Sequence, residues 1–441
     1  MLIVPIPHPL SAAIRVPGSK SLTNRALLIA ALAKGTTRIT NALFSDDSKY
    51  FANALKTLGF DVQLDETNRA MTVAGLGGKI PATKAELFIG NAGTAARFLS
   101  AFLTLGHGEY ILDGDSRMRE RPIGDLAEAL TQLGCNIQPV QKAAGRKQIC
   151  PPLKILASGL KGGKAKIAGD ISSQFLSALL MTAPYAQSPI EVELATELNS
   201  KPYVDMTLSV MKDFGVEVER DGCQSFAVKP NLYSPISNYL VESDASAASY
   251  FFAAPAICGG SVTVENISRK SVQGDIGFLD VLRQMGCMVT ESNNAITVHR
   301  PSSIAGVDID MRDIPDTAQT LAAIAPFADS PTRIRGIASA RVKETDRVHA
   351  ACVELARLGV RVEEHEDGMT IYPTFNLQPS NLQPSTFKPA TIQTYNDHRM
   401  AMAFSLIGLR SDGVTIENPS CVSKTFPNYF EVLNQLRSQP A

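Results

Sequence analysis

Apolar residues at helical spacing alternate along this chain with short β-branched runs, and the alternation repeats. Five segments share one pattern, an amphipathic helix that ends at a glycine and is followed by a strand: LKTLGFDV, LTQLGCNI, MKDFGVEV, LRQMGCMV and LARLGVRV. A glycine in this place is typical of a helix C-cap. The shared glycines, 71 to 81 residues apart, are Gly59, Gly134, Gly215, Gly286 and Gly359. The helices should begin near Asp47, Pro122 with Asp125, Pro202 with Asp205, Asp275, and Asp346.

A second set of helices, rich in alanine and leucine and poor in charge, interleaves with the first. The pattern predicts six of them, over residues 21–34, 93–105, 172–186, 245–258, 316–328 and 397–409. Helices that are apolar on all sides are buried, so the amphipathic helices should lie outside them. With β-branched runs such as SVTVENI between the helices, the chain divides into six strand–helix–strand–helix–strand units, which suggests two domains of three units each.

Polar motifs fall at the amino ends of the apolar helices: SKSLTNR, GNAGTAAR, GDISSQ, DIPDTA and YNDHR. The first is not a nucleotide P-loop, because Ser19 separates Gly18 from Lys20 and the upstream glycine is missing. Helix N-termini carry a positive dipole end and, with Ser, Thr, Lys or Arg beside them, bind anions. A single motif of this kind could be an ordinary capped helix, but its recurrence favours a cleft for a small polyanion.

Composition narrows the class of protein. A chain of 441 residues exceeds what one core usually holds, and 42 basic against 43 acidic residues leave no overall field for nucleic acid or an anionic membrane. Seven scattered cysteines without a C-x-x-C pair indicate a reducing compartment, so we expect a cytoplasmic protein. Neither a targeting segment nor an uncharged 18-residue apolar run is evident, and no heptad seam suggests assembly, so a monomer is expected.

Nine motifs, in order and in spacing, resemble those of the EPSP synthase family of enolpyruvyltransferases. They are VPGSKSLTNRALLIAALA, LFIGNAGTAARFL, RMRERPIGDL, GDISSQFLSALL, SKPYVDMT, DIPDTAQT, RVKETDR, NDHRMAMAF and SKTFPNYF. The resemblance covers essentially the whole chain. It implies an α/β fold of two similar domains, residues 1–18 with 242–441 and residues 19–241. Each would be an inside-out α/β arrangement of three βαβαββ units, and the two would close over a central cleft.

The resemblance also implies transfer of the enolpyruvyl group of phosphoenolpyruvate to the 5-hydroxyl of shikimate 3-phosphate. Phosphate would be released through a tetrahedral intermediate, without a metal or an organic cofactor, in the shikimate pathway to chorismate and aromatic amino acids. By this resemblance, shikimate 3-phosphate would contact Lys20, Ser21, Arg25, Ser172, Ser173, Gln174, Ser200, Tyr203, Asp316, Ser339 and Lys343. Phosphoenolpyruvate would contact Lys20, Asn91, Gly93, Thr94, Arg121, Gln174, Arg347, Arg399 and Lys424.

The chemistry needs a group that takes the hydroxyl proton, a group that protonates the methylene carbon, and cations for the charge of the intermediate. We assign Asp316 as the proton acceptor and Glu344 as the proton donor, with Lys20 and His398 as electrostatic or proton-handling helpers. Which carboxylate acts in which half-reaction stays open. Without the other motifs of the chain, the DHR motif would be interpreted as a helix cap with a surface ion pair, and RVKETDR would be interpreted as a solvated run of charges.

Three features depart from the family pattern. Ala96, Arg97 and Phe98 stand where relatives commonly have Met-Arg-Pro, so the helix start could differ, and Ser339 stands where an asparagine is frequent. The polar, proline-rich stretch 374–393 is expected to be an inserted surface loop.

Two other functions stay open. An enzyme like UDP-N-acetylglucosamine enolpyruvyltransferase should carry a reactive cysteine where RMRERPIGDL has none, and Cys135 lies beyond that motif. A non-catalytic binding protein for phosphorylated metabolites would have no reason to keep Asp316 and Glu344 within its anion-binding motifs.

Overall fold

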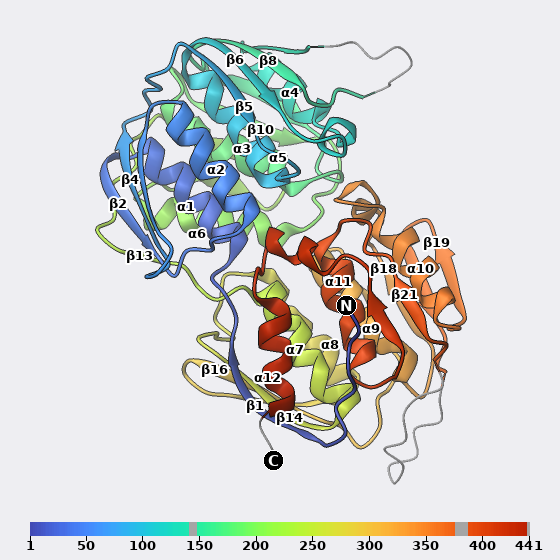
Figure 1. The fold of residues 1–441 in the computed structure, drawn as a ribbon. Helices are drawn as coiled ribbons and strands as arrows, with labels where there is room; N and C mark the ends of the chain where they lie inside the picture. Colours follow the sequence, from blue (N-terminus) through green and yellow to red (C-terminus); the bar gives the residue numbers. More distant parts are fainter. Residues whose placement is uncertain (141–147, 375–386, 439–441) are drawn as a thin grey trace. The chain divides into compact units, whose positions relative to one another are not determined.

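The computed structural model describes residues 1–140, 148–374 and 387–438, which form two compact units (Figure 1). We call Gly18–Val241 the central unit, and Met1–Pro17 with Glu242–Ala441 the terminal unit. The sequence placed Gly18 with the terminal residues, and the structure places it in the central unit. The reason is its packing, because a Cβ on Gly18 would lie 1.8 Å from the carbonyl oxygen of Asn41.

Each unit is built around three apolar helices that pack on one another. They are α1 (Lys20–Leu32), α3 (Gly93–Phe102) and α5 (Ser173–Thr182) in the central unit, and α7 (Ala245–Cys258), α9 (Ala318–Ile324) and α11 (His398–Gly408) in the terminal unit. Nearly all of their side chains are buried, as the sequence predicted. Short 3₁₀ turns extend several of these helices. With those turns included, each predicted range agrees with the observed one to within two residues at either end.

Amphipathic helices cover the apolar ones and bury one face each, which confirms the predicted two-layer helix arrangement. They are α2 (Asp46–Thr57), α4 (Gly124–Gln132), α6 (Lys201–Asp213), α8 (Phe278–Gln284), α10 (Arg347–Arg357) and α12 (Tyr429–Ser438). The sequence marked five of these by their terminal glycine. It did not mark α12, because the segment VLNQLRS within this helix lacks the shared pattern of a leucine-rich turn followed by glycine.

The strands of the central unit form three four-stranded sheets among its described residues. Their orders are β13–β2–β4–β3, β5–β6–β8–β7 and β11–β12–β10–β9. The strands are β2 (Lys34–Thr40), β3 (Asp61–Asp65), β4 (Ala70–Leu76), β5 (Lys84–Phe88), β6 (His107–Asp113), β7 (Asn136–Pro139), β8 (Leu153–Ser158), β9 (Gly163–Ile167), β10 (Ile190–Leu194), β11 (Glu219–Asp221), β12 (Ser225–Val228) and β13 (Tyr239–Leu240).

In the described part of the terminal unit, two sheets have four strands and one has two, with the orders β1–β14–β16–β15, β17–β18–β20–β19 and β21–β22. The strands are β1 (Leu10–Arg15), β14 (Gly260–Glu265), β15 (Met288–Glu291), β16 (Ala295–His299), β17 (Asp308–Asp310), β18 (Thr332–Arg335), β19 (Val362–His365), β20 (Gly368–Ile371), β21 (Ala390–Ile392) and β22 (Val414–Ile416).

Every four-stranded sheet pairs two strands in parallel and adds two antiparallel ones, as a βαβαββ unit requires. In two sheets the first strand comes from a distant part of the chain. β13 pairs with β2, and β1 pairs with β14. The chain therefore passes twice between the units, at residues 17–18 and 241–242.

The expected surface loop at 374–393 is wrong for its last residues. Ala390–Ile392 form β21, parallel to β22, and the buried ring of Phe387 packs on Phe327 with centroids 5.1 Å apart. A three-residue strand is too short to show a period in the sequence, and the prolines around it hid it further. The duplicated Asn-Leu-Gln-Pro-Ser, within residues 375–386, lies outside the described residues. Within the described chain, no helix combines the length and apolar character needed to cross a bilayer.

The glycines that close the amphipathic helices all have left-handed backbone, with φ from +84° to +98°. Gly215, at the end of α6 (φ +87°), has only Ser234 near a would-be Cβ, at 3.5 Å, so backbone conformation alone excludes a side chain there. Gly215→Ala should therefore lower the free energy of unfolding by about 1–2 kcal/mol, the cost of a left-handed residue with a Cβ. Thermal denaturation should show a melting temperature lower by roughly 2–4 °C.

Gly124→Ala is the matched control, because Gly124 opens α4 with ordinary backbone and space for a methyl group. It should be neutral or slightly stabilising. Equal melting temperatures for the two variants would contradict the C-cap interpretation.

Candidate functional site

The α1 helix begins with a capped turn that holds Lys20 in place. Ser19 is the N-cap and its Oγ accepts a hydrogen bond from the Leu22 backbone N–H (3.4 Å). Lys20 Nζ lies 3.6 Å from Asp47 Oδ2, and the two side chains are only 13% and 3% exposed. Sequence reasoning treated Asp47 as a helix start and missed it as the partner of Lys20. Lys20 is therefore a largely buried cation rather than a solvated surface charge.

Arg25, one turn into the same helix, is almost fully buried. Its Nε donates to Thr207 Oγ1 (2.8 Å), and its terminal nitrogens donate to the carbonyls of Ser21 (3.1 Å) and Tyr203 (3.0 Å). Burial lowers the pKa of Arg25 to about 10, an effect that nearby Tyr203 and Tyr239 oppose. These hydrogen bonds satisfy its donors with neutral oxygens, and no carboxylate among the described residues forms an ion pair with it, so the guanidinium favours a nearby anion.

Two hydroxyls that the sequence did not single out orient Arg25. Thr207, on α6, donates to Ser177 Oγ (2.8 Å), and Ser177, on α5, accepts from Arg25 Nη2 (3.4 Å). The ring of Phe98 lies 5.4 Å below the guanidinium. We call Arg25, Ser177, Tyr203 and Thr207 the Arg25 cluster. Both hydroxyls are fully buried, Ser177 on the apolar helix α5 and Thr207 on the covered face of the amphipathic helix α6, and a polar residue at an apolar position of its helix was the available signal.

The start of α3 brings Asn91, Gly93 and Arg121 together. Arg121 Nη1 donates to Asn91 Oδ1 (2.9 Å) and to the Asn91 carbonyl (3.2 Å). A Cβ on Gly93 would lie 2.4 Å from Arg121 Nη2, so only glycine lets the arginine approach the helix start. Thr94 follows, buried. The unusual Ala96-Arg97-Phe98 does not displace the helix, which begins at Gly93.

The remaining predicted residues of the central unit lie at the starts of α5 and α6. Ser172 caps α5, and its Oγ accepts from the Gln174 backbone N–H (3.3 Å). Ser173 is buried behind it. Ser200 precedes α6 with left-handed backbone (φ +57°), and the Tyr203 carbonyl in the first turn receives Arg25.

In the terminal unit, a buried arginine joins three carboxylates. Arg347, at the start of α10, donates from Nη1 to Asp316 Oδ1 (3.0 Å), from Nη2 to Glu344 Oε2 (2.8 Å) and from Nε to Asp397 Oδ2 (2.8 Å). Burial disfavours the charge, but Asp397, Glu344 and Asp316 outweigh it and raise the pKa of Arg347 above its ordinary value. One fully buried cation thus fixes both proposed catalytic carboxylates.

Each of those carboxylates also faces a second cation. Arg399 Nη2 donates to Asp316 Oδ2 (2.7 Å), and Lys424 Nζ lies 3.6 Å from Glu344 Oε1. Arg399 also reaches the buried hydroxyl of Tyr250 (3.5 Å), a contact that the sequence did not suggest. We call Asp316, Glu344, Arg347, Asp397, Arg399 and Lys424 the Arg347 cluster.

The solvent-exposed alternatives for these motifs are wrong. Asp397, the N-cap of α11, is fully buried and accepts from the Arg399 backbone N–H (2.9 Å). Glu344 and Arg347, in the supposed solvated run, are buried as well. Three cations together with three carboxylates in a buried cluster exceed what helix capping requires.

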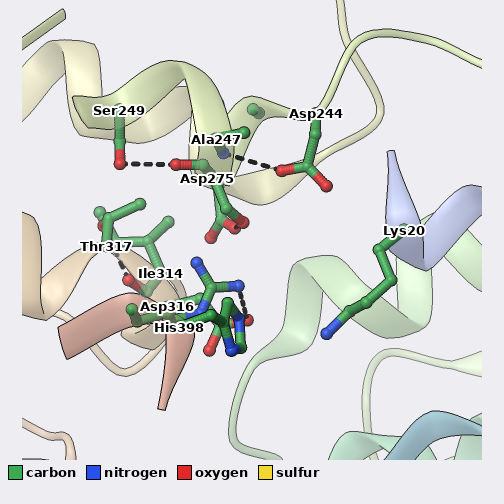
Figure 2. Close-up of polar contacts among 12 residues, drawn as sticks. Lys20, Asp244, Ala247, Ser249, Asp275, Ile314, Asp316, Thr317 and His398 are labelled. Atoms are coloured by element: carbon green, nitrogen blue, oxygen red, sulfur yellow. Dashed lines mark hydrogen bonds and ion pairs between the residues drawn. The ribbon is translucent and has the colours of Figure 1, made fainter. Parts of the chain in front are cut away.

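His398, Ser339 and Lys343 complete the predicted set in the terminal unit. His398 is buried, and its Nδ1 lies 3.6 Å from Asp397 Oδ1. Figure 2 shows His398 beside Asp316, whose turn is held by the Thr317 hydroxyl donating to the Ile314 carbonyl (2.9 Å). Ser339 and Lys343 are partly exposed, within and just after the 3₁₀ turn Ala338–Val342, which packs against the turn that carries Asp316.

Figure 2 also shows a part of the terminal unit that the sequence-based site did not include. Asp244 caps α7 and accepts from the Ala247 backbone N–H (2.8 Å). The Ser246 hydroxyl, on the same helix, donates a hydrogen bond to Asp275 Oδ2. Among residues 1–140, 148–374 and 387–438, no group of three or more His, Cys, Asp or Glu side chains has an arrangement that could hold a metal ion.

Comparison with known proteins identifies relatives over nearly the whole chain. The profile of the EPSP synthase (3-phosphoshikimate 1-carboxyvinyltransferase) family matches residues 4–433. A 3-phosphoshikimate 1-carboxyvinyltransferase of Sulfurovum sp. is 50% identical over 427 residues, which are 96% of either chain. The chloroplastic enzyme of Brassica napus is 49% identical, over 97% of this chain and 83% of its own length.

Solved structures agree with this comparison. EPSP synthase from Acinetobacter baumannii superposes with a TM-score of 0.81 at 27% identity, covering 99% of this chain and 97% of its own. The enolpyruvyl transferase NikO from Streptomyces tendae reaches a TM-score of 0.76 at 16% identity over 98% and 96% of the two chains, a likeness of fold.

The uncompensated charge of Arg25 predicts anion binding that thermal denaturation can measure. Inorganic phosphate at about ten times its Kd should stabilise the chain by about 1.4 kcal/mol, which raises the melting temperature by a few degrees. Chloride at equal ionic strength should not. Arg25→Met should lose the phosphate effect.

Arg220→Met is the matched control, since Arg220 belongs to the same unit but is exposed and paired with Asp205 (2.5 Å). It should keep the phosphate effect. Equal phosphate stabilisation in wild type and Arg25→Met would show that Arg25 does not bind anions.

Proposed function

This chain belongs to the family of EPSP synthases, the 3-phosphoshikimate 1-carboxyvinyltransferases, and we propose that the Arg25 and Arg347 clusters divide the work of its reaction. The reaction transfers the enolpyruvyl group of phosphoenolpyruvate to the 5-hydroxyl of shikimate 3-phosphate and releases phosphate, in the shikimate pathway. It proceeds by addition and elimination through a tetrahedral intermediate. The family match over residues 4–433 decides against the two alternative functions.

The Arg25 cluster and the neighbouring helix starts bind shikimate 3-phosphate. Arg25 supplies charge to the phosphate, supported by its burial among neutral acceptors. Ser172, Ser173 and Gln174 add directional hydrogen bonds from the start of α5. Ser21, Ser200 and Tyr203 line the same binding region, and Lys20 lies between the two substrates. Asp316, Ser339 and Lys343 of the terminal unit are proposed to contribute the remaining contacts.

Phosphoenolpyruvate carries a phosphate and a carboxylate and is bound by cations. Arg121, Arg347, Arg399, Lys424 and Lys20 provide the charge, and arginine forks suit both groups. Asn91, Gly93, Thr94 and Gln174 complete the binding region, Gly93 by leaving room at the start of α3.

The observation that carries the proposal is that Asp316 and Glu344 each lie between two cations. When an anionic substrate enters, Arg347, Arg399 and Lys424 shift part of their attraction to it. Glu344 then lies next to negative charge with less compensation, which favours its protonation. Glu344 is thereby prepared to protonate the methylene carbon, while Asp316 accepts the proton of the attacking hydroxyl. His398 and Lys20 assist by proton handling and by stabilising charge on the intermediate.

General acid–base work of this kind contributes roughly 10²- to 10⁴-fold, and alignment of two substrates roughly 7–11 kcal/mol. Binding geometry should therefore matter more than either carboxylate alone. We further infer that the protein acts in the cytoplasm as a monomer, in keeping with the free cysteines among its described residues and its near-zero net charge.

The mechanism can be tested by following hydrogen isotopes. Addition makes carbon 3 of the enolpyruvyl unit a transient methyl group, so turnover in heavy water should place deuterium in the product's methylene. Glu344→Gln should suppress both this exchange and turnover, and Asp316→Asn should suppress turnover in a folded protein. Mass spectrometry of the product and circular dichroism of the variants measure the two effects. A product without deuterium from active wild-type enzyme would contradict the addition–elimination mechanism. Undiminished exchange in Glu344→Gln would show that Glu344 is not the group that protonates the methylene carbon.

The role of Lys20 can be tested by removing its charge. Lys20→Met should lower kcat/KM by roughly 10²-fold or more while the fold persists, because it removes a buried cation from the reacting groups. Lys49→Met is the control, since Lys49 is also paired, with Glu66 (2.9 Å), but its side chain is 43% exposed. It should retain activity. Near wild-type activity in folded Lys20→Met would show that Lys20 has only a structural role.

A further inference from the structure

We propose that Glu354 and Tyr395 are positioning residues that hold the turn before α11, and with it Asp397 and Arg399, in the geometry that binds phosphoenolpyruvate. The inference rests on the roles proposed above for the Arg347 cluster. Neither residue belongs to that cluster. Tyr395 opens the YNDHR motif but was given no role from the sequence, and Glu354 lies in none of the motifs. The contacts that lead to it come from three elements of the terminal unit.

The turn itself has unusual backbone. The carbonyl of Thr394 accepts from the Asp397 N–H (2.8 Å), and the two residues between them have left-handed φ, +53° at Tyr395 and +54° at Asn396. Turns with two left-handed residues favour Asn and Gly, and a bulky aromatic residue in this conformation is uncommon. Such backbone persists only where the surrounding structure holds it.

Glu354 stabilises this backbone conformation by two hydrogen bonds. It lies on α10 and is fully buried. Its Oε1 accepts from the Tyr395 hydroxyl (2.8 Å), and its Oε2 accepts from the Gln393 backbone N–H (3.1 Å). Arg357 compensates its charge (3.0 Å). Burial and the bond to Glu354 raise the pKa of Tyr395 to about 12, so its hydroxyl stays a donor at neutral pH.

The same helix, α10, also contacts the other end of the turn, at Asp397. α10 begins at Arg347, whose Nε donates to Asp397 Oδ2 (2.8 Å), and Glu354 follows about two turns later on the same face. The turn is therefore clamped at Gln393 and Tyr395 by Glu354, and at Asp397 by Arg347. Because Asp397 caps α11 through the Arg399 N–H (2.9 Å), release of the first clamp would move the start of the helix that carries Arg399.

The test is steady-state kinetics of Tyr395→Phe, which removes one hydroxyl. We expect the KM for phosphoenolpyruvate to rise roughly tenfold, since a misplacement of about 1 Å can cost up to about 100-fold. The KM for shikimate 3-phosphate should change less than about twofold, because the Arg25 cluster is untouched. Tyr429→Phe is the matched control, a fully buried tyrosine whose hydroxyl donates to the Met402 carbonyl (2.9 Å) further along α11. It should lower the melting temperature without changing either KM.

Rescue separates positioning from packing. Asn396→Gly makes left-handed backbone easier, so Tyr395→Phe should raise the KM for phosphoenolpyruvate less in that background than in wild type. An unchanged KM in folded Tyr395→Phe, or no rescue by Asn396→Gly, would overturn the positioning role. Arg399→Lys distinguishes this failure from failure of the proposed function. If Arg399→Lys raises the KM while Tyr395→Phe does not, only the positioning inference fails, and if neither does, the role of Arg399 itself is wrong.

Discussion

The buried guanidinium of Arg347 is the constraint on which the terminal unit depends. A charge removed from water must be matched by partners, and Arg347 finds three carboxylates, on a 3₁₀ turn, on the segment before α10 and on the cap of α11. Asp316 and Glu344 belong to the repeat of α9 and α10, and Asp397 belongs to the repeat of α11 and α12, so the partners can meet only if these two repeats pack in one arrangement. The ion network therefore ties the chemistry to the fold, and the loss of any partner would leave a charge buried without compensation.

Arg25 shows the opposite solution in the central unit. Its donors are satisfied by the neutral oxygens of Ser21, Tyr203 and Thr207, and burial depresses its pKa rather than raising it. Arg347 is thus neutralised by carboxylates of the protein. Arg25 is oriented by neutral groups, and its charge remains available to an anionic ligand. The two units, although built from the same repeat, therefore differ in charge balance: the central unit holds Arg25 among neutral oxygens, and the terminal unit holds Arg347 among three carboxylates. This difference supports the proposed division of work between the two clusters.

Much of the fold can be predicted from the sequence, because buried helix faces require apolar residues at regular spacing. Apolar helices without charge, such as residues 245–258, and glycines after amphipathic helices, such as Gly59, predicted the two helix layers and the repeats. Short elements left no such record, and β21 was hidden within a proline-rich stretch. Site motifs named Asp316, Glu344 and Arg347, but their pairing depends on contacts between distant segments, and so do the roles of Asp47, Ser177 and Thr207. No spacing rule in one chain reveals which buried hydroxyl meets which arginine.

The helix starts connect these observations. Each apolar helix has to be buried for its length, which leaves its amino end as the place where the backbone can meet a polar group. At α1, α3 and α5 the chain places Lys20, Gly93 and Ser172 there, and at α11 it places Asp397, His398 and Arg399. The turn before α11 differs from the others because it needs left-handed tyrosine backbone and a buried glutamate to hold it. The strained backbone thus lies just before Arg399, a cation whose direction has to be fixed. The helix that carries the central cation Arg347, α10, also carries Glu354, which stabilises the strained turn.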